Sequence, residues 1–116
     1  MSGFRHTSAK AAGFHMPAEW APHACCWMAF PASKPVWGDM LSRAQAGYAD
    51  VANAIAAFEP VRLLTPPDVV ELARSLCGAG VEVIPWDLDD AWMRDMGPNF
   101  VRNAEGEVAA SIFHFN

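Results

Sequence analysis

Residues 81–98 read VEVIPWDLDDAWMRDMGP, a short apolar run followed at once by a dense group of charges. The run at residues 81–86 is typical of a buried strand. Behind it, three carboxylates, one guanidinium and one indole lie within residues 89–95, and a Gly-Pro pair follows. Open α/β folds commonly place ligand-binding groups at the carboxyl ends of their strands. The stretch therefore predicts a cation-binding loop, in which Asp95 accepts hydrogen bonds from a planar guanidinium and Trp92 lies against its face.

A purely structural interpretation of the same loop stands beside this one. Asp-Asp pairs often cap helices or turns, and Arg94 can simply pair with a neighbouring aspartate. The Gly97-Pro98 pair can be no more than a turn. The local sequence by itself favours this structural interpretation, because a short motif needs its structural context before it identifies a site.

Short apolar runs and helical patterns alternate ahead of this loop. Residues 24–31 form an apolar run that predicts a strand buried on both faces, with Cys25 and Cys26 as core residues. Residues 34–39 are expected to form a loop. Residues 41–58 predict an amphipathic helix with a candidate N-cap at Ser42. Its apolar stripe comprises Tyr48, Val51, Ala52, Ile55 and Phe58.

A second strand and a second helix complete the alternation. Residues 61–64 predict the strand, and residues 68–77 predict the helix, with Cys77 as a packing residue at its end. The apolar face expected for this helix comprises Val69, Leu72, Ala73 and Leu76. After the acidic loop, residues 99–102 and 108–113 predict a β-hairpin around a turn at residues 103–107. The order β-α-β-α-β followed by a hairpin defines the α/β class.

Composition and charge narrow the possible functions. The chain has 116 residues, a formal net charge of −5 and three cysteines. Because no run of basic residues occurs, we expect no nucleic-acid partner, and because no apolar window approaches the roughly 18 residues of a membrane span, we expect no membrane partner. An odd cysteine count does not suit a disulfide framework, so the expected location is the cytoplasm. No metal-ligand spacing links His15 or His23 to the cysteines, and we expect no metal.

Two segments resemble one enzyme family. DDAWMRDMGPNFV resembles the DDxWxRDxGPxF signature of the agmatine deiminase family, which belongs to the guanidine-modifying enzymes and is related to bacterial peptidyl-arginine deiminases. GFHMPAEWAPHACCWMAFP resembles the opening GFxMPAEWxPHxxxWMAWP of that family, with Phe30 where tryptophan is usual. The resemblance implies a pseudo-fivefold α/β propeller, the pentein fold, of which this chain is the incomplete N-terminal portion. Residues 1–12 are expected to be a flexible arm, and residues 13–116 the truncated domain.

The resemblance also assigns roles to individual residues. Asp95 matches the carboxylate that binds the guanidinium in catalysis, and Trp92 matches an aromatic residue that lines the substrate channel. Asp89 and Asp90 match a leading acidic pair, of which one contacts substrate while the other caps a turn or pairs with Arg94.

Three further residues of the motif are expected to support the site. Arg94 orients an acid from behind. Gly97 and Pro98 fix the turn that aims Asp95. Met96 stands where the family often has a small or polar residue, which leaves the size of the pocket open.

The reaction implied is the hydrolysis of agmatine to N-carbamoylputrescine and ammonia, a step of putrescine biosynthesis that uses no cofactor. The substrate is a small cation, agmatine or an arginine derivative, and the resemblance is compatible with a homo-oligomer, although the sequence does not reveal the oligomeric state. None of the three cysteines matches the position of the family's nucleophile, so we expect this chain by itself to be inactive. The alternatives are a non-catalytic guanidinium- or amine-binding module, an inactive remnant, and a flavodoxin-like βαβ domain of unrelated function.

Overall fold

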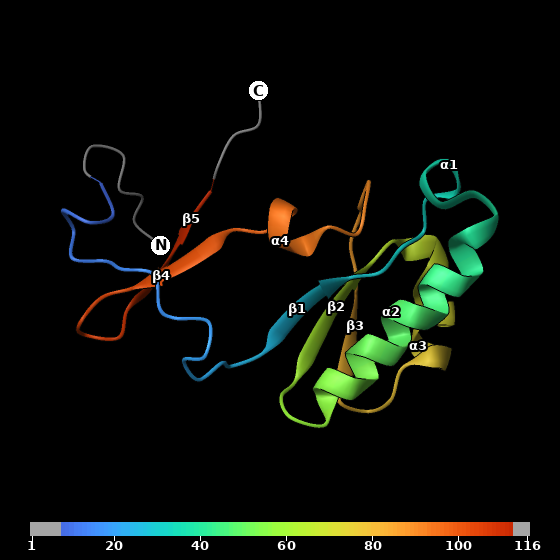
Figure 1. The fold of residues 1–116 in the computed structure, drawn as a ribbon, viewed down its shortest axis with the longest axis horizontal. Helices are drawn as coiled ribbons and strands as arrows, with labels where there is room; N and C mark the ends of the chain where they lie inside the picture. The colour runs from blue at the N-terminus through green and yellow to red at the C-terminus, as the bar shows by residue number, and fades with distance from the viewer. Residues whose placement is uncertain (1–7, 113–116) are drawn as a thin grey trace. The chain divides into compact units, whose positions relative to one another are not determined.

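A computed structural model describes residues 8–112 of the chain (Figure 1). The elements run β-α-β-α-β and end in a β-hairpin, as the sequence predicts. Contacts divide the described residues into two compact units, residues 23–95 and residues 8–22 with 96–112. The boundaries expected for the arm at residues 1–12 and the domain at residues 13–116 stay predictions.

The larger unit is built on a three-stranded parallel sheet. Strands β1 (Cys26–Ala29), β2 (Val61–Thr65) and β3 (Val81–Pro85) lie in that order. Their register sets Met28 beside Leu63 and Leu63 beside Val83. Because all three strands are parallel, their carboxyl ends lie at one edge of the sheet and their amino ends at the other.

Helices cover one face of this sheet. Figure 1 shows α2 (Leu41–Ala56) and α3 (Val70–Leu76) together on that face. The buried residues that join the two layers are Phe30, Ala52, Val61, Leu63, Ala73 and Val81. The two alanines have no exposed surface, and their small side chains let the helices approach the sheet closely. Within residues 8–112, no helix combines the length and the apolar character needed to cross a membrane.

The segment expected as a loop at residues 34–39 is helical instead. It forms a short helix α1 (Lys34–Trp37), with a proline in its first turn, and then the 3-10 turn η1 (Gly38–Met40). The ring of Trp37 meets the ring of Tyr48 edge to face, with centroids 6.1 Å apart and planes at 82°. This aromatic contact ties α1 to α2, which the local sequence does not reveal.

The predicted N-cap of α2 is also wrong. Ser42 lies inside the first turn of the helix, and the capping position is held by Met40, whose side chain makes no capping hydrogen bond. The preceding turn η1 takes over this task, because the backbone N–H of Leu41 donates to the carbonyl oxygen of Gly38.

The predicted apolar stripes of the two helices are confirmed in part: Ala52 and Ile55 of the first and Val69 and Ala73 of the second contact the core. In α2 the buried residues are Gln45, Ala49 and Ala52, whereas Val51 is 52% exposed. The helix ends at Ala56, before the predicted end at residue 58, and Phe58 lies beyond it and is 91% exposed. In α3, which begins after the turn η2 (Pro67–Val69), the buried residues are Val70 and Ala73, whereas Leu72 and Leu76 are 41% and 37% exposed. The buried stripe follows small residues that permit close packing, and not the largest apolar side chains.

The smaller unit contains the predicted hairpin. Strands β4 (Asn99–Arg102) and β5 (Val108–Ser111) pair antiparallel, while the expected end of β5 at Phe113 lies outside the described residues. The side-chain oxygen of Asn103 accepts hydrogen bonds from the backbone N–H groups of Glu105 and Glu107 at 3.1 and 2.9 Å. A single asparagine therefore organises the turn that the sequence places there.

The burial of Leu63 and the exposure of Leu72 predict that the same leucine-to-alanine change lowers stability by different amounts at the two positions. We expect Leu63→Ala to lower the free energy of unfolding by about 2–5 kcal/mol, because it opens a cavity at a fully buried site. Leu72→Ala removes the same atoms from an exposed position and should cost less than about 1 kcal/mol. Urea denaturation of the 116-residue chain, followed by circular dichroism, measures both. Equal losses for the two variants would contradict the packing described above.

Candidate functional site

The acidic segment follows directly from the sheet. The backbone N–H of Trp86 donates to the carbonyl oxygen of Thr65 at 2.8 Å, which extends the pairing of β2 and β3 by one hydrogen bond. The one-turn helix α4 (Met93–Met96) comes seven residues later in the chain, and β4 follows it. The segment therefore starts at the carboxyl edge of the parallel sheet, where the sequence predicts a ligand-binding loop.

Trp92 and Asp95 are linked through their backbones. The N–H of Asp95 donates to the carbonyl oxygen of Trp92 at 3.1 Å and closes a turn. The indole of Trp92 is 56% exposed, and Asp95 is also exposed. A carboxylate and an indole are thus presented to solvent within one turn, the two groups that can pair with and cover a guanidinium.

The two leading aspartates differ in their surroundings. Asp90 is half-buried, and its Oδ1 accepts a hydrogen bond from the backbone N–H of Ala91 at 2.8 Å. Asp89 is exposed at a bend. Of the two roles left open by the sequence, turn capping therefore suits Asp90, and Asp89 is the carboxylate of the pair that faces solvent.

The supporting residues lie in and just after α4. Arg94 is an exposed residue of this helix. Gly97 is half-buried and Pro98 is exposed between α4 and β4, where they end the helical turn. Their role in aiming Asp95 stays a prediction. A second indole on the same segment, Trp86, is 60% exposed, and the sequence analysis did not single it out.

Three side chains on neighbouring strands form a row across the sheet that could not be predicted from the sequence. The register aligns Trp27, Arg62 and Glu82 on neighbouring strands. The guanidinium carbon of Arg62 lies 5.3 Å from the ring centroid of Trp27, and its Nε lies 3.4 Å from Oε2 of Glu82. The only local signal was a charged residue between two apolar ones in β2, and the pairing partners become visible only with the strand register.

Cys26 and Cys77 are packing residues, as the sequence predicts, since both contact the core. Burial raises the pKa of the Cys26 thiol, and Glu59 and Cys25 raise this pKa further. Burial also raises the pKa of Cys77. Both thiols are therefore protonated at neutral pH and are poor nucleophiles.

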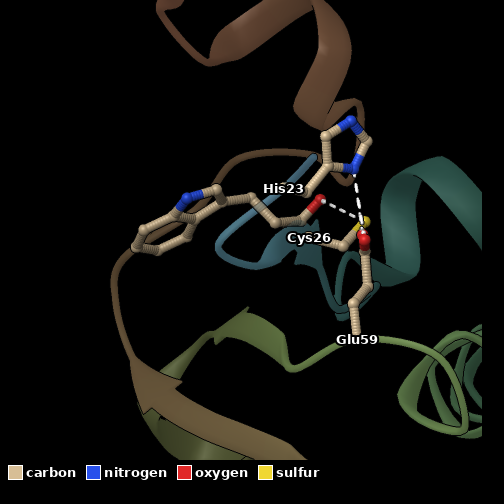
Figure 2. A network of polar contacts seen from close by, with 4 residues as sticks. His23, Cys26 and Glu59 are labelled. Carbon is tan, nitrogen blue, oxygen red and sulfur yellow. Dashed lines mark hydrogen bonds and ion pairs between the residues drawn. The ribbon is translucent and has the colours of Figure 1, made fainter. Parts of the chain in front are cut away.

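Cys26 lies near a histidine–carboxylate pair, as Figure 2 shows. Nδ1 of His23 is 3.2 Å from Oε1 of Glu59, and Sγ of Cys26 is 4.0 Å from the carbonyl oxygen of Trp27. Among residues 8–112, no three metal-ligating side chains are grouped closely enough to hold an ion. Within the larger unit, the pair joins the segment before β1 to the segment before β2.

Comparison with known proteins identifies the family. Residues 15–116 match the Porphyromonas-type peptidyl-arginine deiminases, and the chain belongs to this family. It is 44% identical to an agmatine deiminase of Ectopseudomonas mendocina over 111 residues, covering 95% of this chain and 30% of that protein. It is also 44% identical to an agmatine deiminase of Pseudomonas fluorescens over 112 residues, covering 96% and 30%.

A solved structure supports the same assignment of fold. The agmatine deiminase of Enterococcus faecalis matches with a TM-score of 0.86 at 31% identity, covering 91% of this chain and 29% of that one. The mixed α/β fold is therefore that of the agmatine deiminase structures. The chain spans about 30% of the length of the curated relatives it matches.

The raised thiol pKa values predict low reactivity. A raised pKa lowers the thiolate fraction at any pH below it, so Cys26 and Cys77 should react more slowly with iodoacetamide at pH 7.5 in the folded chain than in urea. Because both pKa values are raised, the folded rates should still be rising at pH values above the ordinary thiol pKa of ~8.5. Mass spectrometry of the alkylated peptides measures each rate. A folded-state rate above the unfolded rate would identify an activated nucleophile and contradict a packing role.

Proposed function

We propose that this chain is part of an agmatine deiminase and that its segment at residues 89–98 binds the guanidinium of agmatine. The observation that carries the proposal is the turn closed by the backbones of Trp92 and Asp95, both of which are exposed to solvent. The 44% identity to agmatine deiminases supports the choice of substrate. Agmatine has a cationic group at each end, which suits a segment with more acidic than basic residues.

In the proposed reaction, Asp95 accepts hydrogen bonds from the guanidinium and Trp92 covers its face. Asp89 adds negative charge, and Asp90 holds the turn. A cysteine thiolate attacks the guanidinium carbon, ammonia leaves, and water then releases N-carbamoylputrescine from the covalent intermediate. Carboxylates that fix the cation in one geometry lower the entropic part of the barrier to this attack.

In this proposal, the catalytic cysteine and histidine lie in the part of the family's proteins that does not align with this chain. The proposal includes the propeller architecture of the family, a cytoplasmic location and a role in putrescine synthesis. It involves no cofactor, because the chemistry is carried by side chains.

A second candidate function is guanidinium binding without turnover. The observation that favours it is that Cys26 and Cys77 pack against the core, where burial raises the pKa of both thiols. For the 116-residue chain by itself, binding through Trp92 and Asp95 would then be the whole activity.

Titration with agmatine tests the proposed site. We expect weak, saturable binding by nuclear magnetic resonance. Asp95→Asn should weaken it about tenfold or more, since a charge-assisted pair becomes a neutral contact. Asp50→Asn alters an exposed acid on α2 and should leave the affinity unchanged. Loss of binding in both variants, or in neither, would count against the assignment of Asp95.

Two further readouts separate the candidate functions and substrates. Ammonia assayed in the same samples distinguishes turnover from binding alone. Replacing agmatine by arginine adds a carboxylate at the far end of the ligand, which an acidic segment should repel. Tighter binding of arginine than of agmatine would overturn the choice of agmatine.

A further inference from the structure

An open cavity of about 610 Å³ lies at the amino-terminal edge of the parallel sheet. Its wall includes Phe58 and Glu59 before β2, Arg62 in β2, and Ala79 before β3. This volume is in the range of small-molecule sites, ~300–1,000 Å³. No residue of the acidic segment at 89–98 lines this cavity, and that segment follows the carboxyl end of β3, whereas the cavity lies at the amino ends of β2 and β3. The cavity is therefore separate from the proposed deiminase site.

Close packing fixes the floor of the cavity. A side chain at Gly80 would place its Cβ 2.9 Å from Cβ of Ala56, so only glycine permits this approach of β3 to the end of α2. Asn53 holds the same region together: its amide donates to the carbonyl oxygen of Leu76 at 3.0 Å and accepts from the N–H of Gly78 at 2.8 Å. The turn before β3 is thus anchored to the helix, and the cavity wall is largely preformed.

The charges around the cavity favour a cation. Helix α2 ends here without a basic residue in its last turn, so the negative end of its dipole is not compensated. Two carboxylates, Glu59 and Glu82, line the wall against one guanidinium, that of Arg62. An anion would have to draw the Arg62 guanidinium away from Trp27 and Glu82, whereas a cation would share the Glu59 carboxylate with His23.

Glu59 is the best-placed carboxylate for a ligand. Its side chain is 26% exposed, which desolvates it more than the 65% exposed side chain of Glu82. It is held by Nδ1 of His23, as Figure 2 shows. Phe58, which is 91% exposed beside it, and the alanines of the wall offer apolar surface that a ligand chain can cover.

We propose that this cavity is a second binding site, which takes a small primary alkylammonium ion. The ammonium group pairs with Glu59, and the alkyl chain packs against Phe58 and Ala79. A ligand with a charged head and an apolar body matches the composition of the wall, because each part of the ligand meets a surface of the corresponding kind.

Titration of the 116-residue chain with butylammonium chloride tests this site. We expect saturable changes in the amide resonances of residues on the cavity wall. Glu59→Gln should weaken the affinity about tenfold, because it removes the ion pair. Glu71→Gln is the matched control, since Glu71 is an exposed residue of α3 that pairs with Arg74 at 2.8 Å and does not line the cavity. An affinity unchanged by Glu59→Gln would overturn the proposal.

Three further measurements make the test specific. Ala79→Leu fills the cavity and should abolish binding while the amide spectrum stays that of a folded chain. Butyrate, which has the same apolar body and the opposite charge, should not bind; equal binding of butyrate would refute a cation site. Asp95→Asn should leave butylammonium binding unchanged, and a loss of binding in this variant would show that the ligand occupies the acidic segment at the other edge.

Discussion

The parallel register of β1, β2 and β3 is the constraint on which the larger unit depends. It requires a helical connection after β1 and another after β2, and both helices pack on the same face of the sheet. It also places different groups of residues at the two edges of the sheet. The acidic segment leaves the carboxyl edge, whereas the wall formed around Phe58, Glu59 and Gly80 belongs to the amino edge. Small residues such as Ala52 and Ala73 permit this packing, because they bring the helices close without a gap.

A guanidinium is bound by an aromatic ring and a carboxylate within the fold, and we propose the same kind of binding for the ligand. Arg62 lies over the indole of Trp27 and beside the carboxylate of Glu82. The exposed indole of Trp92 and the exposed carboxylate of Asp95 offer the same two kinds of contact to a ligand. The internal arrangement stabilises a charged side chain on a sheet surface, since an aromatic face and a carboxylate together replace part of its hydration. The same physical chemistry therefore serves structure at one place and is available for binding at another.

The order of elements could be predicted from the sequence, because apolar runs, helical periodicity and turn residues are local signals. The helix faces could be predicted only in part: Ala52 and Ala73 are buried as expected, whereas Leu72 fits the apolar stripe but is exposed. The acidic segment was visible because its residues are consecutive. The row across the strands and the cavity at the amino edge were not, because their members are adjacent only once the register is formed.

The close approach of Gly80 to Ala56 has a consequence for how related sequences can diverge. With 2.9 Å between an added Cβ and the Cβ of Ala56, a residue larger than glycine at position 80 requires a smaller one at position 56, and only glycine is smaller than alanine. A side chain at position 80 is therefore expected only in relatives that have glycine at position 56. An exchange that moved the bulk from one to the other would keep the helix and strand at the same separation, at the cost of a glycine inside the last turn of α2. This one contact therefore limits the substitutions that related sequences can accept at position 80.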